Sequence, residues 1–303
     1  MLSRTADHLY WLTRYLERAE NLARVLDAAN HLSLSGGVDA VSCWAPVLAI
    51  SGGTEAYDRK YGAVNGIDVI SHAVLDWSNG SGVLSCLKAA RENAHAVRSV
   101  LPTELWQAIN AMWLEARTLD GPALRQRGLI GFGEWVRERS QLVRGIALGT
   151  MRRGEPYHFM RLGTFLERAD DIARILQVMD DRRDAEAARQ LRWAGILRGF
   201  DALQPYRAAY GSDVVPSRVA RLMILDAEQP RSLHFCMDIV HNHLETLCPP
   251  CEGTRLAGAI HSSLRFGRLE DLLADGLAPY CARFVADANR LCNQLHVDFL
   301  MAS

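Results

Sequence analysis

The sequence predicts an all-α protein, a helical bundle built from two tandem copies of one helical unit with approximate two-fold pseudo-symmetry. Three observations lead to this prediction. Apolar residues recur at helical spacing, runs of alternating β-branched residues between hairpin turns are lacking, and the second half of the chain matches the first. With 303 residues, of which 49% are hydrophobic and 23% are charged, the chain is long enough to bury a sizeable core.

The first predicted helix runs through RYLERAENLARVLD, residues 14–27, where charged side chains stand inside an otherwise apolar stretch. Its apolar residues are separated by steps of three and four, the spacing of one helical face. These residues are Leu9, Leu12, Leu16, Ala19, Ala23 and Leu26. Because Trp11, Tyr15 and Leu22 flank this face, we expect the helix to be buried on several sides.

Serine and proline residues mark the starts of four later helices, as N-caps or in the first turn. These residues and the stretches that they open are Ser81 (81–100), Pro102 (103–117), Pro156 (157–176) and Pro230 (231–247). Glycine and serine predict loops between helices near residues 33–37, 51–53 and 79–82.

The second half of the chain repeats the first. Glu17-Arg18-Ala19 recurs as Glu167-Arg168-Ala169, at an offset of 150 residues. The match continues at offsets of 149 or 150, as in Trp44 with Trp193, Tyr57 with Tyr206, Asp76 with Asp226 and Cys86 with Cys236. A register held over so long a stretch predicts two copies, residues 1–150 and 151–303. We expect the copies to pack face to face as one globular domain, with their first helices close together.

Each copy carries a cluster of acids and arginines on its first helix. Together the two clusters form either an ion-pair network that fixes the register of the helices or a pocket. Arg18 and Arg168 face away from the other charges of their helices, so we expect each to reach a carboxylate of a neighbouring helix, such as Asp76 or Asp226. The candidate residues are Glu17, Arg18, Glu20, Arg24 and Asp76 in the first copy and Glu167, Arg168, Asp170, Arg174 and Asp226 in the second.

Four carboxylates inside a helical bundle are typical of divalent-metal sites. Di-iron bundles, however, use a Glu-x-x-His motif on two helices, whereas here the third residue after each glutamate is an acid. We therefore predict no metal and no cofactor. A pocket that binds a carboxylate or a phosphate through its arginines is better supported by these residues.

Histidines and cysteines near residue 245 form a weaker candidate, for a zinc site. Two histidines separated by one residue on a helix face different ways, and the first copy has no equivalent cysteine pair. We therefore interpret His241, His243, Cys248 and Cys251 as ordinary residues at a helix end. The sequence contains no glycine-rich phosphate loop, nucleophile elbow or zinc-protease signature.

Composition narrows the class of protein. A net charge of −1 gives no broad attraction to nucleic acid or to anionic membranes. The chain has neither an apolar run of about 20 residues, which a membrane helix needs, nor an apolar export signal. Seven cysteines, an odd number spread over a long chain, are typical of reduced thiols. We expect a cytoplasmic protein without a nucleic-acid or membrane partner.

Five stretches of the chain carry a resemblance to a known family: residues 1–27, 75–101, 135–151, 157–178 and 225–236. In this order they resemble the bacterial alpha-E family, helical domains of unknown function with a repeated Glu-Arg motif. Members of that family are typically encoded beside circularly permuted ATP-grasp proteins and transglutaminase-like proteins. The resemblance implies a role in ATP-dependent peptide synthesis or modification, and it transfers no catalytic residue.

Three functions stay open, and we favour the first. In it, the chain is an accessory or scaffold protein that assists an ATP-grasp-type peptide ligase, with the ATP-grasp and transglutaminase-like proteins as partners implied by the resemblance. The second is an enzyme with an acidic and arginine-lined pocket between the copies, which binds a carboxylate, a phosphate or a divalent metal. The third is a purely structural interaction module. The sequence also leaves a homodimer open.

Overall fold

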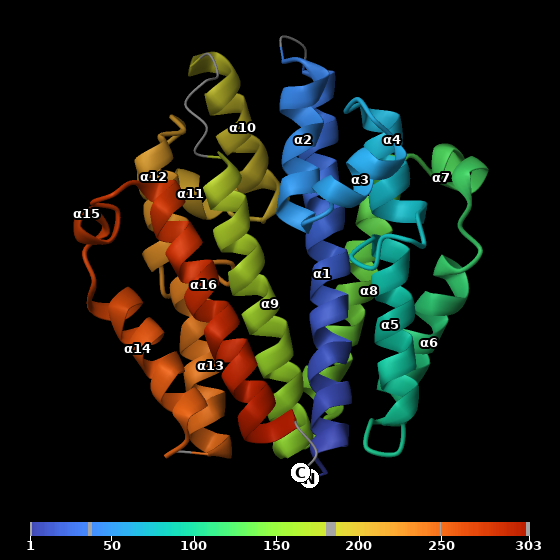
Figure 1. The fold of residues 1–303 in the computed structure, drawn as a ribbon, viewed down its shortest axis with the longest axis vertical. Helices are drawn as coiled ribbons and strands as arrows, with labels where there is room; N and C mark the ends of the chain where they lie inside the picture. The colour runs from blue at the N-terminus through green and yellow to red at the C-terminus, as the bar shows by residue number, and fades with distance from the viewer. Residues whose placement is uncertain (1, 36–37, 180–185, 249, 301–303) are drawn as a thin grey trace.

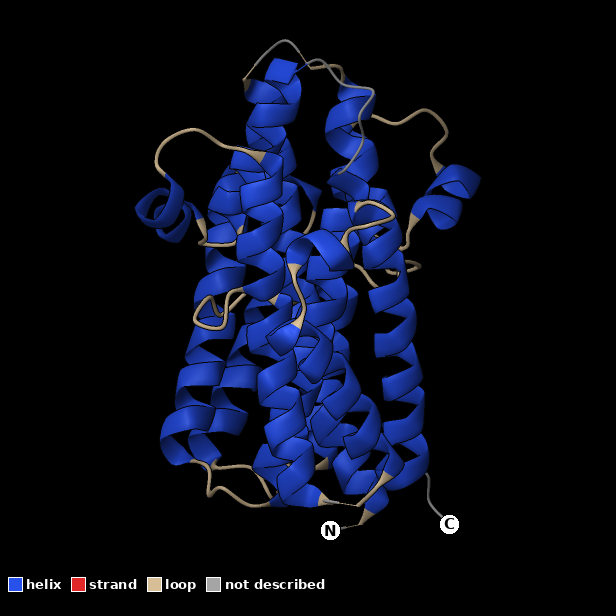
Figure 2. Ribbon diagram, turned by 90° about the vertical axis from the view of Figure 1, so that its left-hand side faces the viewer, coloured by secondary structure: helices blue, strands red, loops and turns tan. Residues whose placement is uncertain are grey.

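The computed structural model describes residues 2–35, 38–179, 186–248 and 250–300 of the chain. Every regular element in these ranges is a helix, which confirms the predicted all-α class. Figure 2, coloured by secondary structure, shows helices throughout. None of the helices in the described ranges is both long and apolar enough to cross a membrane.

The helices of the described part follow one another with short connections. In the first half they are α1 (Ser3–Leu34), α2 (Ala40–Ser51), α3 (Thr54–Lys60), α4 (Gly66–Ile70), the π-helical turn η1 (Ser71–Leu75), α5 (Val83–Ala96), α6 (Thr103–Ala116), α7 (Gly121–Arg127) and α8 (Leu129–Thr150). In the second half they are α9 (Glu155–Met179), α10 (Glu186–Gly199), α11 (Leu203–Tyr210), α12 (Pro216–Leu225), α13 (Leu233–Leu247), α14 (Glu252–Phe266), α15 (Leu269–Leu272), α16 (Leu277–Leu295) and the π-helical turn η2 (His296–Leu300).

Two long helices, α1 and α9, pack against each other along the centre of the molecule (Figure 1). One closed ring of helices contains α1, α5, α6 and α8, because each contacts the next and α8 returns to α1. The helices α9, α13, α14 and α16 form a second ring in the same way. The described part of the molecule therefore contains two four-helix rings that share the contact between α1 and α9.

Short helices cross between the two rings at one end of the molecule. The helix α2 packs against both α1 and α9, and α10 packs against α1. These helices stand at the top of Figure 1, whereas the start of α1 and the end of α16 lie at the bottom. Each half of the chain therefore reaches the central helix of the other half.

The central helices are buried on all sides over more than two turns. Every residue from Ala19 to Leu26 in α1 and from Leu162 to Ala173 in α9 is buried. These stretches contain charged residues as well as apolar ones. Since a buried charge is strongly destabilising unless it is paired, the charges of both helices need partners inside the protein.

The close approach of α1 and α9 depends on Gly163. A Cβ atom at this position would collide with the carbonyl oxygen of Tyr10 and with Oγ1 of Thr13. Oγ1 of Thr13 also donates a hydrogen bond to the carbonyl oxygen of Met160, 2.8 Å away. A residue without a side chain thus sets the distance between the two central helices.

Two helix starts differ from the sequence prediction. The N-cap of α5 is Gly82 rather than Ser81, and no side chain caps this helix. Pro230 lies three residues before α13, which begins after Ser232 instead. Oγ of Ser232 accepts a hydrogen bond from the backbone N–H of Phe235 at 3.0 Å and so caps the first turn of α13. The side chain of a proline has no oxygen that could accept this hydrogen bond.

Replacing Gly163 by alanine should lower the free energy of unfolding by about 1–3 kcal/mol, because the added methyl group forces the central helices apart. Urea denaturation measures the loss. Gly145→Ala in α8 is the matched control, since Gly145 is exposed and nothing lies within 4 Å of its added Cβ. The control should gain about 0.5–1 kcal/mol from its higher helix propensity. Equal effects at both positions would contradict the close approach.

Candidate functional site

The Glu-Arg pairs of α1 and α9 bind each other crosswise. Nε and Nη2 of Arg168, on α9, donate hydrogen bonds to the two carboxylate oxygens of Glu17, on α1, at 2.7 and 3.0 Å. Arg18, on α1, donates through Nε and Nη2 to the two oxygens of Glu167, on α9. Each carboxylate thus receives a two-point hydrogen bond from the other helix. We call these contacts the crosswise ion pairs.

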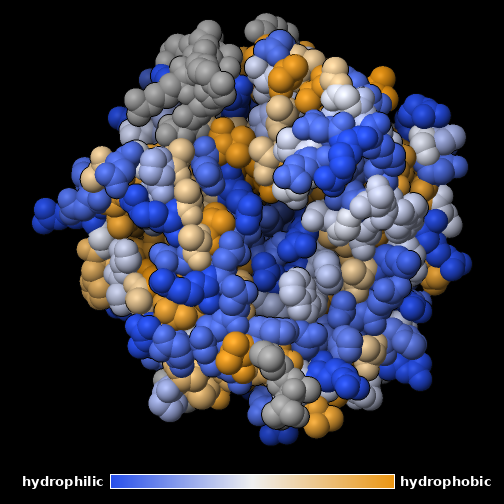
Figure 3. Space-filling view, viewed as in Figure 1, coloured by the Kyte–Doolittle hydropathy of each residue, from blue (hydrophilic) through white to orange (hydrophobic). Residues whose placement is uncertain are grey.

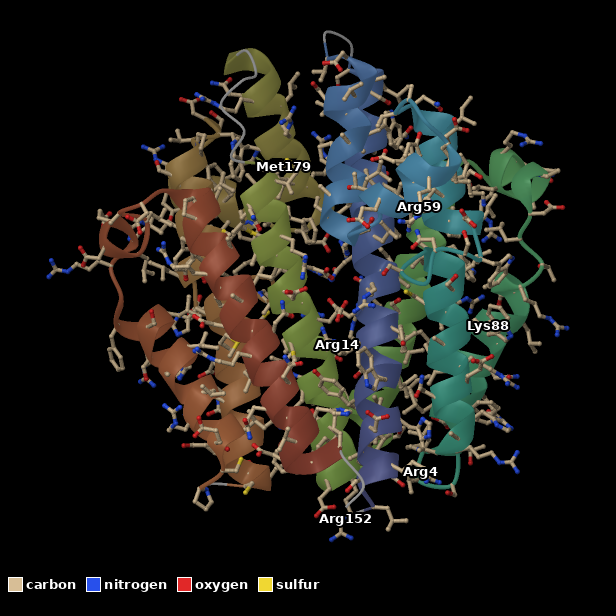
Figure 4. All side chains as sticks on the ribbon, in the orientation of Figure 1. Arg4, Arg14, Arg59, Lys88, Arg152 and Met179 are labelled. Atoms are coloured by element: carbon tan, nitrogen blue, oxygen red, sulfur yellow. The ribbon has the colours of Figure 1, made fainter. Side chains whose placement is uncertain are left out.

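Two further arginines approach the same carboxylates. Nε of Arg14 donates to Oε2 of Glu167, and Figure 4 places Arg14 between α1 and α9. Nη1 of Arg144, on α8, donates to Oε2 of Glu17 at 3.1 Å. Both glutamates are only 1% exposed, so the arginines take the place of water around them.

A second group of ion pairs surrounds Glu20, which is fully buried on α1. Glu20 accepts hydrogen bonds from Nε of Arg24 at 2.9 Å and from Nη2 of Arg231 at 2.7 Å. Arg231 precedes α13 in the chain and is buried, and its Nη1 donates to Oδ1 of Asn21 at 2.8 Å. An arginine far from the Glu-Arg motif in sequence is therefore enclosed by side chains of α1.

Acidic residues also line a flank of α9. Asp170 accepts hydrogen bonds from Nε and Nη2 of Arg174, at 2.7 and 3.4 Å. Asp171 accepts one at 2.6 Å from Nδ2 of Asn21. Because the other amide atom of Asn21 binds Arg231, this one side chain links the charged groups on the two sides of the central helix pair.

A cavity of about 300 Å³ lies on this flank, between α1, the end of α2 and α9. It opens beside Gly52, which is exposed. Figure 3 shows a hydrophilic hollow near the centre of the face on which α1, α2 and α9 lie. The polar residues of the cavity wall are Arg18, Asn21, Ser51, Ser81, Glu167, Asp170, Asp171 and Arg174.

Burial and neighbouring charges act on these acids in opposite directions. Burial raises the pKa values of Glu17 and Glu167, but the surrounding arginines outweigh it and hold both pKa values below their ordinary range. Asp171 differs. Burial, followed by the charges of Glu167 and Asp170, raises its pKa well above the ordinary value. The negative charge of Asp171 is therefore poorly compensated by the protein.

The prediction that Asp76 and Asp226 pair with Arg18 and Arg168 was wrong. Asp76 follows η1 and lies 2.8 Å from Nζ of Lys60, and Asp226 accepts hydrogen bonds from two backbone N–H groups in the turn after α12. Both aspartates follow helix ends, where a carboxylate accepts from free backbone donors. The glutamates of the facing central helix are closer to the arginines. Of the remaining candidates, Glu17, Arg18, Glu167 and Arg168 bind one another across the interface of α1 and α9. Glu20 pairs with Arg24 along α1, and Asp170 pairs with Arg174 along α9.

Sequence reasoning missed three arginines of the network, Arg14, Arg144 and Arg231. Arg144 lies on a different helix and bridges Glu17 and Glu20. Arg231 had a detectable signal. It stands at the offset of 150 from Ser81, so a charged residue replaces a small one inside an otherwise matched stretch.

The residues considered for a zinc site point to different neighbours. His241 faces Glu245, whereas Nδ1 of His243 lies 2.7 Å from Nδ1 of His158. Cys248 and Cys251 lie between α13 and α14, where the backbone N–H of Cys251 donates to the carbonyl oxygen of Cys248. No group of three or more residues suited to a metal ion occurs within the described ranges.

Comparison with known proteins adds a family. The model of the Alpha-E family, a predicted alpha-helical domain with a conserved ER motif, matches residues 1–300. Uncharacterized proteins of Mycobacterium bovis and of two Mycobacterium tuberculosis strains are each 23% identical to the chain over 308 residues. The match covers 93% of this chain but 35% of each relative, so the chain spans about a third of their length. No solved structure matches it.

Replacing Glu17 by alanine should lower the free energy of unfolding by about 3–5 kcal/mol, because it leaves Arg168 buried without the carboxylate that it binds through two hydrogen bonds. Denaturation followed by circular dichroism measures the loss. The matched control is Glu55→Ala, since Glu55 forms an exposed ion pair with Arg59 at 3.7 Å. The control should remain close to the parent protein. Similar small losses for both variants would show that the crosswise ion pairs do not hold the central helices together.

Stability should fall as the pH drops from about 6.5 toward about 4, through His243. Burial, followed by the charges of His158 and two nearby arginines, lowers the pKa of His243 to about 4 in the folded protein. In this window the unfolded chain binds more protons than the folded one, so lowering the pH favours unfolding.

The variant His243→Asn should flatten this part of the profile of melting temperature against pH. Asparagine suits the position, because Asn93 makes the comparable contact with His8, from Oδ1 to Nδ1 at 2.8 Å. Parallel profiles for the parent protein and the variant between pH 4 and 7 would contradict the role of His243.

Proposed function

We propose, because the chain belongs to the Alpha-E family, that it is an accessory protein of an ATP-grasp-type peptide ligase. In this role it binds the ligase and presents an amino-acid or peptide group during ATP-dependent peptide synthesis or modification. The family resemblance supports a circularly permuted ATP-grasp protein as the partner, with a transglutaminase-like protein as a second one. The seven free cysteines support a cytoplasmic location.

The observation that carries this proposal is the cavity between α1, α2 and α9. Its volume is at the lower end of the range for small-molecule sites, and the described residues that line it include no histidine, cysteine or lysine. Burial raises the pKa values of Cys86, close to Arg18, and Cys236, close to Arg168, to about 12. These thiols are therefore poor nucleophiles at neutral pH. Among the described residues of the wall, the serines Ser51 and Ser81 have no histidine or lysine base beside them, which favours binding over covalent catalysis.

The length of the relatives also supports a role beside other domains. The match takes up 35% of each mycobacterial relative, so in those proteins the helical unit is joined to further chain. A helical unit that is joined to further chain in its relatives fits an accessory role. The binding of a ligase by this chain is our proposal.

We also infer that residues 1–150 and 151–303 are two copies of one unit related by an approximate two-fold axis. Two observations support this duplication. In the described residues, the order and relative lengths of α1, α5, α6 and α8 recur in α9, α13, α14 and α16, and each set closes into a ring. The two crosswise ion pairs, Arg18 with Glu167 and Arg168 with Glu17, are also equivalent under exchange of the two halves, as a two-fold axis requires.

A second candidate function is an enzyme whose pocket binds a carboxylate, a phosphate or a divalent metal. Arg18 and Arg174 in the cavity wall favour it, because guanidinium groups bind carboxylates and phosphates strongly. However, Arg18 already donates to Glu167, and Arg174 to Asp170. The third candidate, a purely structural module, agrees with the crosswise ion pairs but assigns no role to the cavity.

Co-expression with the ATP-grasp protein encoded nearest to this chain tests the proposed function. We expect the two proteins to co-purify, and the complex to hydrolyse ATP faster than the ligase alone when candidate amino acids are added. Ser81→Arg, which places a guanidinium in the cavity, should keep the complex but abolish the stimulation. Ser212→Arg adds the same charge at an exposed turn and should keep both.

The absence of both a complex and a change in ATP turnover would rule out the accessory role. Peptide formation by the chain alone would favour the enzymatic alternative instead. Stimulation of ATP turnover that persists in the Ser81→Arg variant would show that the accessory role does not depend on the cavity.

A further inference from the structure

One side of the central helix pair holds a guanidinium group that the chain itself supplies. The guanidinium of Arg231 donates to Oε1 of Glu20 at 2.7 Å and to Oδ1 of Asn21 at 2.8 Å, and it reaches Oε1 of Glu17 at 3.4 Å. Glu17, Glu20 and Asn21 lie on consecutive turns of α1. One short stretch of this helix therefore accepts all three of these hydrogen bonds from one guanidinium group.

The positions 150 residues further on carry the same pattern on α9. They are Glu167, Asp170 and Asp171, of which only the last differs in charge from its counterpart Asn21. At the same offset, the counterpart of Arg231 is Ser81. A serine side chain is too short to reach these acids as an arginine does. The cavity of about 300 Å³ lies at this place, with Ser81 and all three acids in its wall.

We propose that this cavity binds the guanidinium group of a ligand, held by Glu167, Asp170 and Asp171 as Arg231 is held by Glu17, Glu20 and Asn21. The inference rests on the duplication proposed above. It also deepens the proposed function, because it names the chemical class of the group that the cavity receives: the side chain of arginine or a related small guanidine.

The arginines in the cavity wall do not exclude a third guanidinium. Arg18 donates to Glu167 and Arg174 to Asp170, so their charges are engaged. On the other side of the central helices, Arg168, Arg24 and Arg144 likewise engage the acids that also bind Arg231. Neighbouring arginines therefore share carboxylates in this protein without displacing one another.

The replacement of Asn21 by Asp171 makes the cavity more suited to a cation. Asn21 offers one neutral amide oxygen to Arg231, whereas Asp171 offers a carboxylate. Burial and the charges of Glu167 and Asp170 raise the pKa of Asp171, and they outweigh the opposing effects of its hydrogen bond from Asn21 and of the charge of Arg18. A bound guanidinium would supply the missing counter-charge.

The wall also indicates how a ligand enters. Ser81 and Ser51 are half-buried and Gly52 is exposed, so the cavity opens between the end of α2 and the loop before α5. The acids lie on the opposite, buried wall formed by α9. A ligand would therefore enter with its guanidinium first and leave the rest of the molecule outside. This direction suits an arginine side chain, either free or at the surface of a peptide.

Calorimetric titration of the full chain tests this inference without any partner protein. The probes are N-acetyl-arginine methylamide and its neutral isostere, N-acetyl-citrulline methylamide. We expect the arginine probe to bind at one site per chain and the citrulline probe to bind at least about tenfold more weakly, because it lacks the charge. A short peptide with one internal arginine and the small guanidine agmatine distinguish a peptide ligand from a free one.

Three variants and one control identify the site. Ser81→Arg should abolish binding by filling the cavity, and Ser212→Arg, at an exposed turn, should leave it unchanged. Asp171→Asn reproduces the residue that binds Arg231 and should weaken binding about tenfold by removing one charge. Arg231→Ser should open a second site and double the number of arginine probes bound per chain, or, if it is unstable, should be stabilised by millimolar methylguanidinium.

Several results would overturn the proposal. They are equal binding of the arginine and citrulline probes, binding of acetate or phosphate that Ser81→Arg abolishes, and no binding of either probe. Because the titration needs no ligase, its failure is distinct from failure of the accessory role. A complex with stimulated ATP turnover but no arginine binding would leave the proposed function intact and refute only the ligand.

Discussion

The exchange of charges between α1 and α9 is the constraint on which the rest of the structure depends. A charged side chain buried without a partner is strongly destabilising, and both helices bury several. Burial of each helix therefore requires counter-ions, and each central helix supplies a two-point arginine partner to the glutamate of the other. Since a two-point hydrogen bond between an arginine and a carboxylate has narrow geometry, it fixes the rotation and the register of the helices. Apolar contacts, which have no preferred direction, do not fix them as sharply.

The remaining architecture follows from this central pair. Gly163 allows the two backbones to approach closely enough for side chains of one helix to reach those of the other. The two rings then cover the outer faces of α1 and α9 with apolar surface. The protein thus places ions at its centre and apolar layers around them. On one side of the centre the protein supplies the guanidinium of Arg231, and on the other side it leaves a cavity.

Sequence patterns predicted those features of the structure that depend on residues close together in the chain. Helical spacing identified the central helices, and the repeated Glu-Arg motif directed attention to their interface. The partner of each arginine was not predictable in this way. Asp76 and Asp226 were reasonable by sequence, but a partner is chosen by distance, and the facing helix is nearer than the turns. The contacts of Arg231 and the cavity were harder to predict, because Arg231 and Ser81 lie in loops. Only the complete fold determines where these loops lie relative to α1 and α9.

The mutual dependence of α1 and α9 has a consequence for the order of synthesis. At about 5–20 residues per second, α1 leaves the ribosome on the order of ten seconds before α9 is complete. During this interval α5, α6 and α8 are available to α1, but the carboxylate of Glu17 has no Arg168 to bind. A growing chain therefore exposes a face of α1 that matches the α9 of any neighbouring copy. Polysomes, which bring growing copies together, are where exchange of central helices between chains is most favoured.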